Sequence, residues 1–167
     1  MEKMNGRIIT IGDTFRTIQE AMRCFGKETV NGPKPCLYHF DSTDIAIWFP
    51  LSPVLNDDGL YVPRRDKKWL NILCKDEHDE ETDLTEVWVT PEIDDKYPND
   101  PYCIRAVFMG YENDGKSKYV FKGVFIRIFG SADNRSHIFR RIDKNIHTAL
   151  FTNFIEKSHD CYGMVDE

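Results

Sequence analysis

The sequence predicts an α+β fold, in which a curled, largely antiparallel β-sheet or a small β-barrel carries one helix near the N-terminus, with a second candidate helix near the C-terminus. Roughly seven short segments rich in β-branched and aromatic residues are separated by turn residues. Strand and helix patterns do not alternate regularly, which argues against a doubly wound sheet. Aromatic residues make up 13% of the chain, as in a β-rich core or a stacking site. The length of 167 residues indicates a single domain over 1–167, with frayed ends at 1–6 and 157–167.

The segment 118–129 is the clearest strand of the sequence. Side chains on both of its faces are apolar, which predicts a central strand. A second strand over 102–111 precedes it, and the turn residues 112–115 join the two into a hairpin. Gly123 lies in the middle of the long strand, where glycine is costly unless the strand bends or another group approaches the backbone closely.

Two segments have helical spacing of their apolar residues. Residues 14–25 predict an amphipathic helix that ends before Gly26, with apolar positions at Phe15, Ile18, Met22 and Phe25. Residues 144–156 predict a second helix, with apolar positions at Ile146, Leu150 and Phe154.

The aromatic residues also suggest a binding site. A base pocket needs two or three flat side chains and a polar group that reads the base edge. Asn71 follows Trp69 by two residues, so a strand places both side chains on one face. The candidate ligand-binding residues are Trp48, Trp69, Asn71, Trp88, Tyr119 and Phe121. The alternative is that these aromatics fill the core, and for any single one of them this is the favoured interpretation.

Basic residues near these aromatics are candidates for phosphate contacts. Arg140 and Arg141 follow an aromatic residue directly and are the favoured pair. The complete set comprises Lys122, Arg140, Arg141, Arg64 and Arg65. The alternative interpretation of each is a solvated surface cation.

The net charge of −6 is unevenly distributed. Residues 76–100 carry 11 acidic and 1 basic side chains, a net charge of −10. The segment is either a solvated loop or a docking surface for a basic partner. The second option gives an alternative function, an acidic interaction or inhibitor protein related to phage or defence systems.

Other classes of chemistry have little support in the sequence. Five cysteines without a Cys-x-x-Cys pair indicate reduced thiols and a cytoplasmic protein. Cys36-x-x-His39 lacks a second ligand pair, so we predict no metal, no cofactor and no catalytic residues. A small nuclease that uses His137 and His147 is a less favoured alternative. No apolar run approaches the ~20 residues that cross a bilayer, so we expect no membrane partner.

Five short motifs follow one another over about residues 45–145. They are Trp48-Phe49-Pro50, Trp69-Leu70-Asn71, Arg105-Ala106-Val107-Phe108, the Tyr-x-Phe-x-Gly-Val-Phe pattern at 119–125, and Phe139-Arg140-Arg141-Ile142. In order and spacing they resemble an accessory module of bacterial restriction-like proteins that is commonly found beside an HNH-type nuclease domain. The Tyr-x-Phe-x-Gly-Val-Phe motif is the most specific of the five.

The resemblance implies a small β-barrel-like module in the style of base-reading SRA, EVE and related PUA-like domains. Such modules recognise nucleic acid, often through a modified or flipped base. The predicted function is therefore a non-enzymatic module that binds nucleic acid, with DNA favoured, or a nucleotide. A nuclease or another defence protein is an expected partner.

Overall fold

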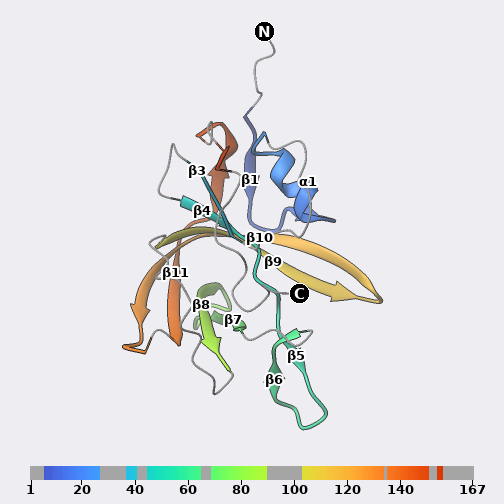
Figure 1. The fold of residues 1–167 in the computed structure, drawn as a ribbon, viewed down its shortest axis with the longest axis vertical. Helices are drawn as coiled ribbons and strands as arrows, with labels where there is room; N and C mark the ends of the chain where they lie inside the picture. The colour runs from blue at the N-terminus through green and yellow to red at the C-terminus, as the bar shows by residue number, and fades with distance from the viewer. Residues whose placement is uncertain are drawn as a thin grey trace.

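The computed structural model describes residues 6–26, 37–40, 45–64, 69–89, 103–133, 135–150 and 154–155 (Figure 1). Its elements are β1 (Ile8–Thr10), β2 (Thr14–Phe15), α1 (Ile18–Arg23), β3 (Leu37–Phe40), β4 (Ile45–Trp48), β5 (Val54–Leu55), β6 (Tyr61–Val62), β7 (Trp69–Lys75), β8 (Glu81–Trp88), β9 (Ile104–Asn113), β10 (Lys116–Gly130), β11 (Ser136–Asp143), β12 (Asn145–His147), η2 (Thr148–Leu150) and β13 (Phe154–Ile155). No helix within these ranges is long and apolar enough to cross a membrane.

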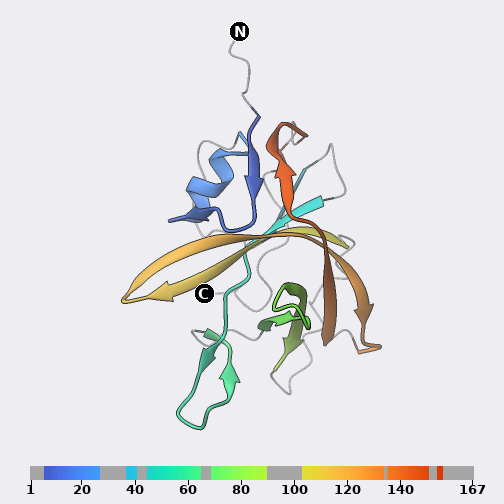
Figure 2. The same ribbon diagram turned by 180° about the vertical axis from the view of Figure 1, so that it is seen from behind.

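The main sheet has nine strands in the order β13-β3-β4-β9-β10-β11-β8-β7, with β2 paired to β10 off this path. All of its ladders are antiparallel except the parallel pairing of β4 with β9. β9 and β10 form a long curved band, and β11, β8 and β7 lie on one side of it (Figures 1 and 2). The prediction of a curled, largely antiparallel sheet is confirmed. The barrel version is wrong, because β13 and β7 form open ends of the described sheet rather than pairing with each other.

The hairpin of β9 and β10 is confirmed, and β10 is a central strand between β9 and β11. The pairing of β10 with β9 shifts by one residue between Phe121 and Gly123. Gly123 has φ +117, and a Cβ placed there would lie 2.6 Å from Arg141 Cδ and 2.7 Å from the Asp143 carbonyl oxygen. Both conditions that make glycine favourable inside a strand, a bulge and a close approach, are therefore met.

The N-terminal helix is shorter than predicted. Thr14 and Phe15 form β2, where Phe15 pairs with Tyr119 of β10, and the helix begins only at Ile18. Thr17 caps it, because its hydroxyl oxygen accepts a hydrogen bond from the Glu20 backbone N–H at 3.0 Å. Phe15 has helical spacing to the later apolar residues, but a strand ladder buries it instead.

The predicted C-terminal helix over 144–156 is wrong, because the described residues of this range form β12, the short 3₁₀ helix η2 and β13. Ile146 pairs with Ile9 in the ladder of β12 with β1, and both side chains are buried. Phe154 belongs to β13, which pairs with β3. An apolar residue every fourth position matches a helix stripe, but short strands separated by a turn produce the same spacing.

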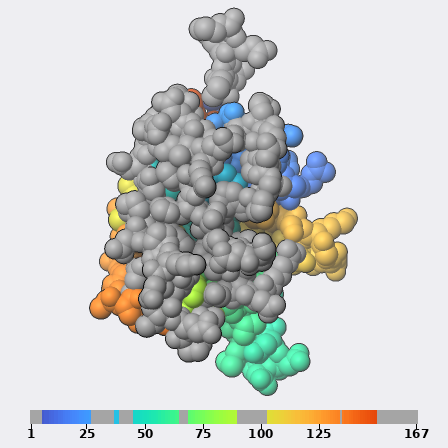
Figure 3. All heavy atoms as spheres, viewed as in Figure 1, coloured from blue at the N-terminus to red at the C-terminus, as the bar shows by residue number. Residues whose placement is uncertain are grey.

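The main hydrophobic core lies against β4, β9 and β10, and the buried guanidinium of Arg105 packs on two of its rings, Trp48 and Phe139. Phe108 is its centre, with ring contacts to Phe15, Phe25, Phe49 and Phe121. Trp69 and Trp88 form a second, smaller hydrophobic cluster. The hairpin of β5 and β6 projects away from the body of the molecule (Figure 3).

Candidate functional site

A hairpin formed by β7 and β8 supplies most of the candidate site. Asp76 sets its turn, since the carboxylate oxygen Oδ1 accepts hydrogen bonds from the backbone N–H groups of His78 and Glu80 at 2.8 and 3.0 Å. The resulting register places Trp69 opposite Trp88 and Asn71 opposite Glu86. On the other side of β8, His137 of β11 also pairs with Glu86. Residues paired in register project from the same face of a sheet, so these five side chains lie together.

We call Trp69, Asn71, Glu86, Trp88 and His137 the Trp–Asn cluster. The rings of Trp69 and Trp88 meet edge to face, with centroids 5.0 Å apart and planes at 69°. The Trp69 ring also stacks on the His137 ring, with centroids 6.0 Å apart and planes at 27°. Both indoles are 7% exposed, so the cluster is closed to solvent in this structure.

Asn71 carries an unusual atom in this cluster. The side chain is 6% exposed, and its carbonyl oxygen Oδ1 is buried without a hydrogen-bond partner among the described residues. Most buried polar atoms are hydrogen-bonded, and an unsatisfied one costs about 1–3 kcal/mol. The described residues therefore leave the acceptor capacity of this oxygen unused.

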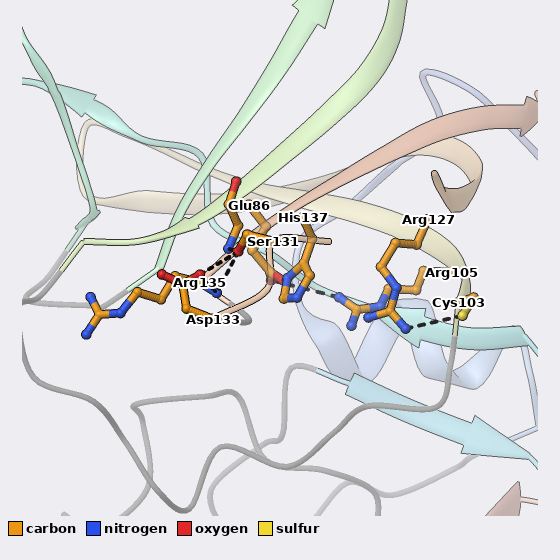
Figure 4. A network of polar contacts seen from close by, with 9 residues as sticks. Glu86, Cys103, Arg105, Arg127, Ser131, Asp133, Arg135 and His137 are labelled. Carbon is orange, nitrogen blue, oxygen red and sulfur yellow. Dashed lines mark hydrogen bonds and ion pairs between the residues drawn. The ribbon is translucent and has the colours of Figure 1, made fainter. Parts of the chain in front are cut away.

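Glu86 and His137 of this cluster also form a buried charged group with Arg105 (Figure 4). One carboxylate oxygen of Glu86 lies 2.9 Å from His137 Nδ1, and the other lies 3.9 Å from an Arg105 guanidinium nitrogen. If Glu86 is a carboxylate, Nδ1 is the donor, because a carboxylate oxygen only accepts. The guanidinium of Arg105 packs between the rings of Trp48 and Phe139, at 4.4 and 4.6 Å from their centroids.

Sequence reasoning missed Glu86 and Arg105 as site residues. A charged residue in a strand is usually assigned to the solvent face. Glu86, however, lies at every second position with Leu84 and Trp88, on the buried face of the strand. That alternation was the available signal. In the sequence, His137 stands out only as a candidate nuclease residue. It lies on β11, whereas the other candidate of that hypothesis, His147, lies on β12.

The other predicted ligand-binding aromatics lie elsewhere. Trp48 and Phe121 are buried in the main core. Tyr119 is half-buried and packs on Phe49 with ring centroids 5.6 Å apart. The structure therefore brings together three of the six predicted side chains, namely Trp69, Asn71 and Trp88.

The predicted phosphate-binding residues are mostly engaged within the chain. Lys122 Nζ lies 2.9 Å from a Glu81 carboxylate oxygen, and Arg140 makes two hydrogen bonds to Asp83 at 3.1 and 3.2 Å. Burial alone would lower the pKa of Lys122, but hydrogen bonds to Glu81 and Tyr111 outweigh it and raise the pKa.

Two further arginines of the predicted set have contacts within the fold. Arg141 donates to the Lys122 carbonyl oxygen at 3.4 Å. Arg64 is nearly buried, donates to the Ser52 hydroxyl at 2.7 Å and lies 3.5 Å from Glu112. Arg64 thus fastens the base of the β5–β6 hairpin to β9. Arg65 lies outside the described residues.

The acidic segment is partly neutralised by the same contacts. Glu81 and Asp83 pair with Lys122 and Arg140. Glu80 lies 2.9 Å from Lys144 Nζ, and this hydrogen bond lowers the pKa of the Glu80 carboxyl. Residues 90–100 of the segment lie outside the described residues. No group of three or more His, Cys, Asp or Glu side chains that could hold a metal ion occurs in the described part of the chain.

Comparisons with known proteins bear on this site. The family model of the SET and RING associated (SRA) domain matches residues 3–148. Among solved structures, the chain is similar to "The 5-Hydroxymethylcytosine-Specific Restriction Enzyme AbaSI", with a TM-score of 0.56 and 17% identity over 83% of this chain. The match covers 42% of that enzyme's chain, and at this identity it shows a shared fold alone. No curated protein matches the chain.

Proposed function

Because the chain belongs to the SET and RING associated domain family, as the resemblance predicted, we propose that it binds DNA and reads a modified base at the Trp–Asn cluster. The base leaves the duplex and stacks on Trp69 or Trp88, while Asn71 contacts its edge. Enzymes and readers that need access to a base must take it out of the stack, and a closed site of aromatic side chains suits an extruded base.

The observation that carries this proposal is the buried Oδ1 atom of Asn71. The atom has no hydrogen-bond partner among the described residues, yet it lies on the same strand face as two tryptophans. A nucleobase supplies what the site lacks, because it has a flat face for stacking and N–H groups on its edge. A purely structural aromatic cluster has no need for an amide at this position.

Binding must open the cluster, because both indole rings are almost fully buried and in contact with each other. Stacking on an aromatic side chain contributes roughly 1–3 kcal/mol per base. A base bound to Asn71 also removes the cost of its unsatisfied oxygen. These two gains offset the separation of the rings and the extrusion of the base, which is itself a few kcal/mol.

The proposal also includes contacts between basic side chains and the DNA phosphates. Lys122 and Arg140 already pair with Glu81 and Asp83, so each must exchange a carboxylate for a phosphate. Arg141 donates its hydrogen bond to a backbone carbonyl and acts on the Glu80 carboxyl only through its charge, so it is the better candidate. Each phosphate contact adds to the salt dependence of binding.

We further propose that the chain acts as a binding module and not as an enzyme. The nuclease activity named for the similar structure belongs to a chain of which this one spans 42%. A nuclease or defence protein as partner, and a cytoplasmic location, stay predictions. The alternative of an acidic inhibitor that docks through residues 76–100 also stays a prediction.

The test is a binding titration, followed by fluorescence anisotropy. The probes are three labelled duplexes of one sequence that carry a single cytosine, 5-methylcytosine or 5-hydroxymethylcytosine, measured at two salt concentrations. We expect saturable binding, a preference for one modified form and a clear salt slope. The same duplexes incubated with Mg²⁺ or Mn²⁺ report cleavage. Equal affinity for all three duplexes, or no binding at tens of micromolar, would contradict the proposal.

A further inference from the structure

We propose that Arg141 and Lys144 form a binding site for a backbone phosphate of DNA, and that the Glu80 carboxylate occupies this site in the free protein. Glu80 then competes with DNA for the two cations. This inference rests on the DNA binding proposed above, and it adds a phosphate contact at Lys144 and an internal competitor for that contact.

Gly123 creates the space in which Arg141 lies. A Cβ at position 123 would be 2.6 Å from Arg141 Cδ and 3.1 Å from Arg141 Cγ, so the stem of the arginine passes over the bare backbone of the β10 bulge. At its end, the guanidinium donates a hydrogen bond to the Lys122 carbonyl oxygen at 3.4 Å. This bond uses one of the five N–H donors of a guanidinium, which leaves capacity for an anion.

Lys144 adds a second cation to the site. The residue lies between β11 and β12, and its Nζ is 2.9 Å from a carboxylate oxygen of Glu80. The hydrogen bond and the charge of Lys144 lower the pKa of the Glu80 carboxyl, and the charge of Arg141 adds to this effect. Both cations therefore act on one anion, which is Glu80 in the free protein.

The turn between β7 and β8 brings Glu80 to this position. The Glu80 backbone N–H donates to Asp76 Oδ1 at 3.0 Å, and the Glu80 carbonyl oxygen accepts a hydrogen bond from the Asp76 backbone N–H at 2.8 Å. Lys144, by contrast, is 64 residues away in the sequence. The place of Glu80 is thus set within its own hairpin, and a change of its side chain should leave the turn intact.

The contact between Glu80 and Lys144 is of a kind that a phosphate can displace. The two side chains are 50% and 54% exposed, so water and salt ions reach both of them. Exposed ion pairs contribute little to folding stability. A phosphate accepts the same charge-assisted hydrogen bonds as a carboxylate, and DNA presents a continuous row of phosphates.

The site lies on the sheet face of the Trp–Asn cluster. Phe125 pairs with Arg141 on one side and with Arg105 on the other, so these side chains project from one face. Arg105 in turn contacts Glu86 of the cluster. Arg141 follows His137 by four residues along β11, which is about 13 Å at the usual rise of a strand. This distance is about the rise of four nucleotides, so the backbone beside an extruded base can reach the site.

Glu80→Gln tests the competitor by fluorescence anisotropy. The probes are two labelled duplexes of one sequence, with a single cytosine or 5-hydroxymethylcytosine. We expect the variant to bind both duplexes about threefold more tightly than the wild-type protein at low salt, because both cations are released. The gain should disappear at high salt. Glu77→Gln is the matched control, because it removes the same charge from the same turn but Glu77 contacts His78. The control should bind like the wild-type protein.

Lys144→Gln, alone and combined with Glu80→Gln, tests the cation. If a phosphate and Glu80 compete for Lys144, the loss of Lys144 weakens binding about threefold more in the Glu80→Gln background, where no carboxylate has to be displaced. In that background it should also reduce the slope of log K against log salt by about 0.9, the contribution of one phosphate contact. An ion pair with a structural role alone changes thermal stability and leaves the slope constant.

The outcomes separate this inference from the proposed function. If neither the wild-type protein nor Glu80→Gln binds a duplex, the proposed function fails and this inference fails with it. If DNA is bound but Glu80→Gln behaves like Glu77→Gln, or Lys144→Gln has the same effect in both backgrounds, the phosphate site is refuted and the proposed function stands. If Glu80→Gln tightens binding of both duplexes but neither protein prefers a base form, the phosphate site is supported and base reading at the Trp–Asn cluster is refuted.

Discussion

The main core and the Trp–Asn cluster are both rich in aromatic side chains, yet they differ in what accompanies the rings. In the main core, the rings of Phe15, Phe25, Phe49 and Phe121 each contact the ring of Phe108. Around Trp69, the rings share their sheet face with a buried amide and a buried carboxylate. Aromatic residues alone therefore do not locate a site in this chain. The buried amide of Asn71 and the buried carboxylate of Glu86 are what make the Trp–Asn cluster the candidate site.

The largest expected effect comes from the main core. Phe108→Ala removes a fully buried ring with four aromatic neighbours and should lower the free energy of unfolding by about 3–5 kcal/mol. Urea denaturation measures this change. DNA binding by the fraction that stays folded should be unchanged. A loss below about 1 kcal/mol would contradict the central position of this ring.

Trp69→Ala tests the Trp–Asn cluster. The variant should weaken binding of a modified duplex by about one to two decades, since one stacking surface is lost. Its cost in stability should be smaller than that of Phe108→Ala, because Trp69 lies on a strand at one end of the described sheet and packs on Trp88 and His137. Anisotropy and urea denaturation on the same samples measure both quantities. If Trp69→Ala unfolds the protein while the folded fraction binds normally, Trp69 is core.

Asn71→Leu should separate function from stability. Leucine is close in size and removes a buried oxygen that lacks a partner among the described residues, so the free energy of unfolding should stay constant or rise by up to about 1 kcal/mol. Binding should nevertheless weaken by about tenfold, because the contact to the base edge is lost. A large loss of stability would show that Asn71 has a structural partner in the folded protein.

Gly123→Ala tests the bulge that bends β10 near Arg141. An alanine there must adopt φ +117 and place its Cβ against Arg141 and the Asp143 carbonyl, so we expect a destabilisation of about 1–3 kcal/mol. Thermal and urea unfolding measure it. Gly115→Ala is the control, because that glycine also has positive φ but meets nothing within 4 Å. Equal losses for both would assign the effect to backbone conformation alone.

The smallest effect is expected at the surface ion pairs. Asp83→Asn releases Arg140 from its two hydrogen bonds, and a released cation should tighten DNA binding by about two- to threefold at low salt. The same variant measured at high salt should show little change, because salt screens exposed charges. Weaker binding at low salt would contradict a phosphate contact by Arg140.

Strand patterns in the sequence were informative wherever local alternation decided the structure. The central position of β10, its hairpin with β9 and the need for Gly123 all follow from residues near one another in the chain. The shared face of Trp69 and Asn71 follows from the same period of two. The helix boundaries were less predictable, because Phe15 and Ile146 are buried by strands that are distant in sequence.

The candidate site was only partly predictable for the same reason. Arg105 meets Glu86 across strands that are far apart in the sequence, and its position between Trp48 and Phe139 depends on the whole sheet order. The ion pairs of Lys122 and Arg140 with the β7–β8 hairpin likewise join distant segments. A pattern along one strand cannot reveal which cations are already neutralised by another.

The position of β7 at one end of the described sheet has a consequence for dynamics. β7 carries Trp69 and Asn71 and is paired in the described structure only to β8. A terminal strand can separate from its neighbour without disturbing the ladders behind it, so its amide hydrogens should exchange with solvent faster than those of β9 and β10. Bound DNA should then slow the exchange of β7 most of all, because its contacts with Trp69 and Asn71 would hold this strand in place.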